Sequence, residues 1–194
     1  QILNLPKDDF IFCCFNTINK ILPNIVKLWA EILNHVPKSV LWLLSDNDDA
    51  KKNLKIEFEK KKIDPKRIIF GTKVPITEHL KRIKFADLFL DTFPYNAHTS
   101  CSDSIWAGLP ILTLEGDSFQ SRVASSLLKT TGLIELVAKN EKEYLDKAVH
   151  IAKNREYLNQ LKNKLLASKD SNPLFDNKSF THNIENAYSI VFEK

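Results

Sequence analysis

Glycine is scarce in this chain, with four residues in 194, and methionine is absent. The scarcity of glycine bears on function, because dehydrogenases and P-loop enzymes hold phosphate groups in loops that need closely spaced glycines. Neither a G-x-G-x-x-G pattern nor a Walker loop occurs in the sequence. Both enzyme classes are therefore disfavoured, and an anion-binding site would have to use helix N-termini and hydroxyl groups.

Cysteine is also rare, with only Cys13, Cys14 and Cys101. Three cysteines argue against a disulfide framework, and no Cys/His spacing suggests a metal, so we expect neither metal nor cofactor. The sequence has no signal peptide and no run of about 18 apolar residues, so we expect no membrane contact and a cytoplasmic location. Because the chain starts at Gln1 without a methionine, we expect it to be a fragment of a longer protein.

The charge balance is modest, at +4, and the composition of 43% hydrophobic and 27% charged residues is that of an ordinary globular protein. Lysines gather in residues 51–66 and 139–169, where acidic residues are interleaved at helical spacing. This pattern is typical of solvated helix faces. No basic stripe with interleaved aromatic residues occurs, so we expect no nucleic-acid partner.

Apolar runs alternate with amphipathic stretches over residues 1–138. The continuous apolar runs are typical of strands buried on both faces, and they lie at Phe10–Phe15, Val40–Leu44, Arg67–Phe70, Asp87–Leu90 and Ile111–Leu114. Helical spacing falls between them, at Pro23–His35, Asp48–Lys61, Thr77–Ala86, Thr99–Ala107 and Ser118–Thr130. The alternation predicts an α/β fold, with a Rossmann-like parallel sheet and helices on both faces.

Residues 139–194 carry helical patterns alone, at Glu141–Lys153, Arg155–Ser168 and Ser179–Phe192. We expect these helices to form a C-terminal extension of the α/β core. The whole chain, residues 1–194, is predicted to be a single lobe.

The stretch from Asp87 to Pro110 combines a buried strand, a polar loop and the start of a helix. Free backbone N–H groups and the helix dipole favour an anion at such a place. His98, Thr99 and Ser100 add polar donors there, and Asp103 lies one turn further on, where acidic residues bind ribose in nucleotide folds. The alternatives are that His98 only caps the turn and that Asp103 only complements the dipole.

Other polar residues also follow predicted strands. Lys20 comes after the first strand and could pair with a phosphate, although a solvated lysine is an equal alternative. His79 and Arg82 share a helix face, where they could contact a base and a phosphate or could be ordinary surface residues. Asp87 and Asp91 flank the fourth strand and are more typical of local backbone bonding than of acid–base chemistry.

Several motifs in this order resemble the C-terminal half of the catalytic region of protein O-GlcNAc transferases and the related SPINDLY-type proteins. The resemblance covers nearly all of the chain. It rests on FNTINKILP, VPKSVLWLL, TEHLKR, ADLFLDTFPYNAHTSCSDSIWAGLP, GLIELVAKNEKEY and SNPLFD. It implies one lobe, the donor-binding lobe, of a GT-B glycosyltransferase, which has two Rossmann-like lobes.

The resemblance also implies roles for single residues. Lys20 matches the lysine on the donor diphosphate, where it would act in catalysis by stabilising the UDP leaving group. His79 matches the histidine that stacks on uracil, with Arg82 beside it. The phosphate turn of the family corresponds to His98, Thr99 and Ser100, and its ribose-binding aspartate to Asp103. Thr17 stands where the family usually has glutamine near the sugar.

The implied function is metal-independent transfer of a sugar, GlcNAc in the main branch, from a UDP-sugar to a protein Ser or Thr. In the family the acceptor is bound by an N-terminal lobe and tetratricopeptide repeats, which this sequence lacks, so the fragment alone is expected to bind UDP weakly and turn over little. Related branches use GDP-fucose or transfer hexose from a UDP-sugar. A further alternative is a non-catalytic nucleotide-binding or interaction module.

Overall fold

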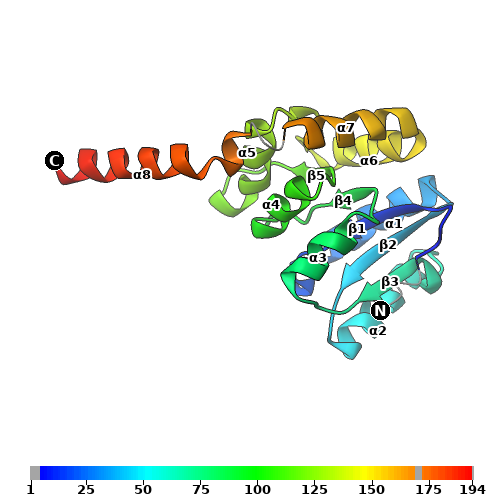
Figure 1. The fold of residues 1–194 in the computed structure, drawn as a ribbon. Helices are drawn as coiled ribbons and strands as arrows, with labels where there is room; N and C mark the ends of the chain where they lie inside the picture. The colour runs from blue at the N-terminus through cyan, green and yellow to red at the C-terminus, as the bar shows by residue number, and fades with distance from the viewer. Residues whose placement is uncertain (1–4, 169–171, 194) are drawn as a thin grey trace.

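The structure of the chain is a computed structural model that describes residues 5–168 and 172–193. Within these ranges, six parallel strands form one sheet in the order β3-β2-β1-β4-β5-β6 (Figure 1). The strands are β1 (Phe10–Cys14), β2 (Ser39–Leu44), β3 (Ile68–Gly71), β4 (Leu88–Leu90), β5 (Ile111–Leu114) and β6 (Val137–Ala138). The predicted Rossmann-like α/β fold is confirmed.

The middle of the sheet is apolar and buried. Every residue of β1 is buried, and Phe12 pairs with Leu41 of β2 on one side and with Leu88 of β4 on the other. A strand covered on both faces has no solvent-facing positions, which is why FIFCC reads as a continuous apolar run rather than an alternating one.

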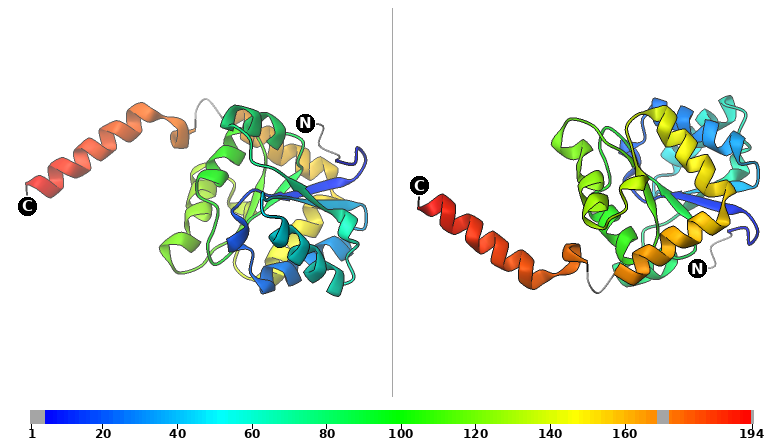
Figure 2. Two further views of the ribbon diagram at one scale, coloured as in Figure 1. Left: turned by 90° about the horizontal axis from the view of Figure 1, so that it is seen from below. Right: turned by 90° about the horizontal axis from the view of Figure 1, so that it is seen from above.

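Helices cover both faces of the sheet (Figure 2). On one face, α1 packs against α2 and α6, and on the other, α4 packs against α3, α5 and α7. These helices are α1 (Pro23–His35), α2 (Asp48–Lys60), α3 (Ile76–Ile83), α4 (Thr99–Trp106), α5 (Val123–Thr130), α6 (Glu141–Lys153) and α7 (Arg155–Ser168). Right-handed crossovers of this kind bring the loops that follow the strands to one edge of the sheet.

Some element boundaries differ from the sequence-based expectation. The predicted helix at Ser118–Thr130 is divided, because a 3-10 turn at Phe119–Ser121 precedes α5. Ser118 and Ser121 form a capping box there, which closes a short turn of its own. The segment after β1 contains a second 3-10 turn, Ile18–Lys20, and β6 was not predicted because two residues give no periodic signal.

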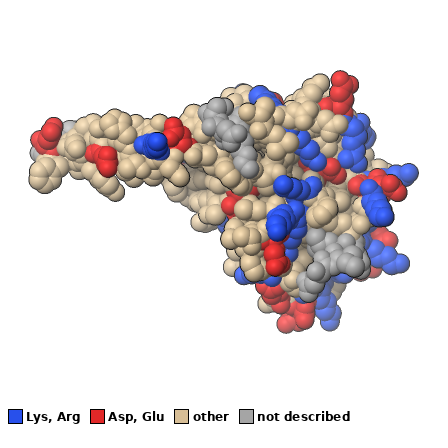
Figure 3. Space-filling view, in the orientation of Figure 1, with Lys and Arg blue, Asp and Glu red and all other residues tan. Residues whose placement is uncertain are grey.

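The last helix, α8 (Asn177–Phe192), projects away from the sheet and its covering helices (Figures 1 and 2). None of its residues is buried, and its surface is largely uncharged (Figure 3). By contrast, α6 and α7 bury Tyr144, Leu158 and Leu161 in the common core. None of the helices in the described ranges has the length and hydropathy needed to cross a membrane.

Candidate functional site

The carboxyl ends of the central strands carry several polar residues, some of which the sequence analysis selected. Asn16 and Lys20 follow β1, the segment from Asp91 to His98 follows β4, and α4 begins immediately afterwards. Ligands of open α/β sheets bind at this edge, where the strand order changes direction between β1 and β4. The site can therefore be built from these two loops outward.

Lys20 reaches across from the loop after β1 to the loop after β4. Its Nζ donates to the carbonyl oxygen of Asn96 at 2.8 Å and lies 3.8 Å from the centre of the Tyr95 ring. Partial burial lowers the pKa of Lys20, while the carboxylate of Asp91 acts in the opposite direction. The ammonium group is thus held at the sheet edge rather than extended into solvent.

His98 lies on the other side of Tyr95. The two rings are stacked, with centroids 5.2 Å apart, and the edge of Phe119 approaches the imidazole at 6.1 Å. His98 is the N-cap residue of α4, its side chain makes no capping bond, and its Nε2 lies 3.5 Å from the carbonyl oxygen of Gln120. The first N–H groups of α4 are those of Thr99 and Ser100, and neither donates a hydrogen bond to another group in the part of the chain that the structure describes.

Ser100 is connected to the loop after β1 by a buried amide. Its Oγ donates to Oδ1 of Asn16 at 3.0 Å, and Nδ2 of Asn16 donates to Oδ1 of Asp91 and Oγ1 of Thr92. We refer to Asn16, Lys20, Tyr95, His98 and Ser100 as the lysine cluster. Sequence reasoning missed Asn16 and Tyr95, although Asn16 adjoins Thr17 and Tyr95 lies three positions before His98.

Asp91 is fully buried at the end of β4 and bonds local backbone, as expected. Its Oδ1 accepts the N–H groups of Thr92 and Ala97, at 2.8 and 2.7 Å, and its Oδ2 accepts the hydroxyl of Thr113 at 2.7 Å. Burial raises the pKa of Asp91 to about 6, and these donors oppose the rise. Asp87 lies at the opposite end of β4, paired with Lys162 at 3.1 Å.

His79 and Arg82 form a second group on α3. Nε of Arg82 donates to Nδ1 of His79 at 3.1 Å, and its Nη1 donates to the carbonyl of Thr72 at 2.7 Å. The imidazole and the Phe15 ring lie at 74° to each other, with ring centroids 5.1 Å apart. Burial and the Arg82 charge lower the pKa of His79 to about 4, so its ring is neutral at physiological pH. We call Phe15, His79 and Arg82 the histidine cluster.

The two clusters meet at β1, because Phe15 and Asn16 are consecutive residues at its end. Thr17 follows them; it is exposed, and its carbonyl accepts the N–H of Lys20 at 3.0 Å. Asp103 lies on α4 one turn after Ser100, and burial raises its pKa. Its carboxylate makes no hydrogen bond within residues 5–168 and 172–193, so it is available to a ligand hydroxyl.

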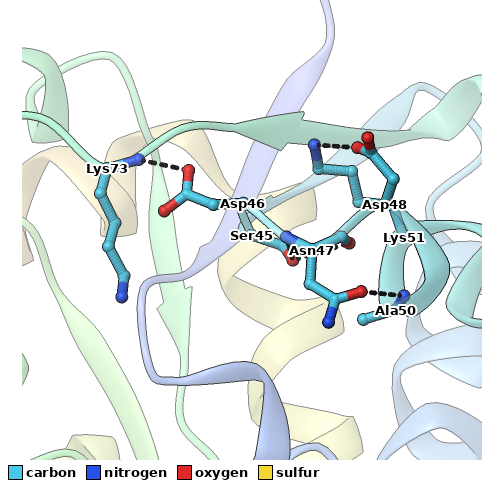
Figure 4. A network of polar contacts seen from close by, with 7 residues as sticks. All are labelled: Ser45, Asp46, Asn47, Asp48, Ala50, Lys51 and Lys73. Atoms are coloured by element: carbon cyan, nitrogen blue, oxygen red, sulfur yellow. Dashed lines mark hydrogen bonds and ion pairs between the residues drawn. The ribbon is translucent and has the colours of Figure 1, made fainter.

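The loop after β3, which Arg82 contacts, is also held from the neighbouring loop (Figure 4). Oδ1 of Asp46 accepts the backbone N–H of Lys73 at 3.2 Å, and the side chain of Asn47 caps α2 by accepting the N–H of Ala50. In Figure 4 the ammonium group of Lys73 points away from Asp46. The loop after β3, which adjoins the histidine cluster, is therefore held at two points: Arg82 donates to the carbonyl of Thr72, and Asp46 accepts the N–H of Lys73.

Solved structures share this architecture. TarM, from S. aureus, superposes with a TM-score of 0.60 at 12% identity, which is a likeness of fold alone. An O-GlcNAc transferase variant from Thermobaculum terrenum superposes with a TM-score of 0.89 at 31% identity, over 95% of this chain and 38% of that one. The lobe is therefore of the Rossmann-like kind that builds GT-B glycosyltransferases.

The family is narrower than the fold. The model of glycosyl transferase family 41 matches residues 1–184, and the chain belongs to this family. A Caenorhabditis elegans UDP-N-acetylglucosamine–peptide N-acetylglucosaminyltransferase is 37% identical over 190 residues, 98% of this chain. The probable enzyme of that name, SEC, from Arabidopsis thaliana is 39% identical over 185 residues, and SPINDLY from Solanum lycopersicum is 33% identical over 187.

The chain is much shorter than these relatives. It spans 16% of the Caenorhabditis elegans protein, 19% of SEC and 20% of the tomato SPINDLY protein. The family resemblance inferred from the motifs is confirmed by these matches. They do not test the roles expected of single residues, which stay predictions.

Proposed function

We propose that this chain is the donor-binding lobe of a protein N-acetylglucosaminyltransferase, which binds the UDP moiety of UDP-GlcNAc at the carboxyl edge of its sheet. The observation that carries the proposal is the convergence of Lys20, His98 and the first turn of α4 at the family's expected diphosphate position. A cation, an imidazole and free helix N–H groups together form a strong site for a diphosphate.

The chemistry follows from where charge develops during transfer. When the bond between the sugar and UDP breaks, negative charge grows on the leaving diphosphate. Lys20 and the N–H groups of Thr99 and Ser100 would stabilise that charge, and preorganised donors of this kind lower the barrier because they need no reorientation. The ammonium group already has a fixed position over Tyr95, which reduces the cost of ordering it on binding.

The histidine cluster would take the other end of the nucleotide. His79 is neutral, partly buried and in contact with Phe15, so its ring suits an uncharged uracil better than a phosphate. Asp103 would accept hydrogen bonds from the ribose hydroxyls. In this arrangement the nucleotide crosses from α3 to the start of α4, and the sugar lies near Thr17.

The acceptor half of the reaction would come from outside this sequence. The base for the acceptor hydroxyl and the protein-binding surface are expected in an N-terminal lobe and tetratricopeptide repeats. Transfer would proceed without a metal, because the charge on UDP is balanced by side chains and backbone. Our prediction for the compartment stays the cytoplasm, where the buried thiols of Cys13, Cys14 and Cys101 would remain reduced.

Calorimetric titration with UDP tests the proposal directly. Lys20→Ala should weaken UDP binding about 30-fold, the usual effect of losing a charge-assisted hydrogen bond. Lys153→Ala is the matched control, since this exposed lysine ends α6 away from the site. Binding by the wild type no tighter than by Lys20→Ala would overturn the proposal. Tighter binding of GDP than of UDP would replace the UDP-sugar with a guanine-based donor.

A further inference from the structure

Asn16 occupies a position in the polar network that the proposed diphosphate chemistry does not explain. It is 3% exposed, in the segment that follows β1, and both polar atoms of its amide are hydrogen-bonded. The amino group donates to Asp91 at 2.9 Å and to Thr92 at 2.7 Å, and the carbonyl oxygen accepts the Ser100 hydroxyl at 3.0 Å. A buried side chain with three such bonds is costly to remove and fixes the groups that it contacts.

The partners of Asn16 control the geometry of the loop after β4. Asp91 accepts the N–H groups at both ends of this loop, at Thr92 and Ala97, and so holds its ends together. Thr92 also donates through its hydroxyl to the carbonyl of Tyr95 at 2.7 Å. The middle of the loop presents Tyr95 and the carbonyl of Asn96, the two groups that hold Lys20.

We propose that Asn16 is a positioning residue that couples the start of α4 to the loop after β4, and so sets Ser100, Lys20 and His98 in one arrangement for a diphosphate. One side of its amide contacts the helix start through Ser100, and the other side contacts the anchor of the loop through Asp91. This inference rests on the proposed function, since it assigns a role toward the same UDP site.

Thr113 provides a matched comparison within the same network. Like Asn16, it donates one hydrogen bond to the buried carboxylate of Asp91, but it lies within β5 and contacts none of the lysine cluster in the described hydrogen bonds. If Asn16 served stability alone, loss of either donor would have the same consequences. If Asn16 positions the site, loss of Asn16 should weaken UDP binding, whereas loss of Thr113 should not.

The experiment compares Asn16→Ala with Thr113→Val in the 194-residue chain, by calorimetry with UDP and by hydrogen exchange of the segment 92–102. Both variants should lower the melting temperature. Asn16→Ala should also weaken UDP binding about tenfold and speed exchange at residues 92–100, as expected from one lost bond to a charged partner. Thr113→Val should leave the affinity within about twofold.

A double-mutant cycle adds a readout that a change in stability alone would not alter. Ser100→Ala in the Asn16→Ala background should cost less affinity than Ser100→Ala in the wild type, because the two residues act as one unit. Equal losses of affinity in Asn16→Ala and Thr113→Val, or exchange at residues 92–100 unchanged by Asn16→Ala, would overturn the inference. If wild-type UDP binding is absent, the proposed function fails, and the exchange comparison still decides whether Asn16 couples the loop to α4.

Discussion

The lysine cluster and the histidine cluster lie at the same sheet edge but are built in different ways. The lysine cluster joins residues more than 70 positions apart in the sequence through hydrogen bonds, with |i−j| of 76 between Lys20 and Asn96 and 84 between Asn16 and Ser100. The histidine cluster takes His79 and Arg82 from one short helix and relies on an aromatic contact with Phe15.

This difference fits the proposal that the two clusters bind the two halves of one nucleotide. A diphosphate needs several donors at fixed positions, and long-range hydrogen bonds to a buried anchor provide them. A base needs a flat and uncharged surface, which a half-buried imidazole with its pKa near 4 provides. The comparison teaches that one edge of a sheet can bind both a charged and a neutral ligand group, because the local surroundings set the charge of each side chain separately.

Removal of the Asp91 charge should give the largest effect, on stability rather than on binding. Because burial raises the pKa of Asp91 from 3.8 to about 6, its contribution to stability is fully present below about pH 4 and is lost as the pH rises through 6. Asp91→Asn lacks this dependence. Relative to wild type, the variant should gain up to about 3 kcal/mol of unfolding free energy between pH 4 and pH 7.

Urea unfolding of both proteins at each pH measures this gain. Titration of the buried neighbours of Asp91 does not contribute to the gain. Burial raises the pKa values of the Cys14 and Cys101 thiols and of the Tyr144 phenol, so these groups stay neutral over this pH range. If the free energies of unfolding of the wild type and of Asp91→Asn changed in parallel with pH, burial of the Asp91 charge would carry no energetic penalty.

His79→Ala should have the next largest effect. It should weaken binding of the nucleoside rather than of the phosphate groups. Loss of the stacking surface should weaken uridine binding about tenfold, within the range seen for base stacking. Because the pKa of His79 is about 4, uridine affinity should be constant from about pH 5 to about pH 8. A change in uridine affinity centred near the ordinary histidine pKa would contradict the neutral state assigned to this cluster.

Tyr95→Leu should have a smaller effect, confined to the lysine cluster. The exposed ring lies under Lys20 and beside His98, and a cation–π contact at an exposed site contributes about 0.5–1 kcal/mol. UDP affinity should fall about twofold to fivefold. Tyr95→Phe keeps the ring and should bind as the wild type does in the same titration; an equal loss in both variants would move the effect to the phenol hydroxyl.

Much of the fold was predictable because buried strands and amphipathic helices leave strong local patterns. Continuous apolar runs such as FIFCC and VLWLL gave the parallel sheet and its loop edge. The two-residue β6 and the capping box that starts the 3-10 turn Phe119–Ser121 have no such pattern. The strand β6 depends on its pairing with β5, and the capping box depends on one pair of serine hydroxyls. Neither feature produces a hydrophobic periodicity in the sequence.

The site was predictable only in part. Lys20 and His98 are conspicuous because charged and imidazole side chains follow buried strands. Asn16 and Tyr95 are not, because an asparagine or a tyrosine in a loop is ordinary until distant segments are brought together. Their importance comes from contacts across 75 to 84 positions of sequence, such as the bond from Ser100 to Asn16, and the chain order alone does not encode those distances.

The central claim is that the two clusters bind different halves of one nucleotide. It is tested most directly by the ratio of UDP affinity to uridine affinity, measured by calorimetry for the wild type, Lys20→Ala and His79→Ala. We predict that Lys20→Ala lowers this ratio about 30-fold with uridine binding unchanged, and that His79→Ala weakens both ligands and leaves the ratio near the wild-type value. A ratio that is unchanged in Lys20→Ala, or that falls equally in both variants, would contradict the account.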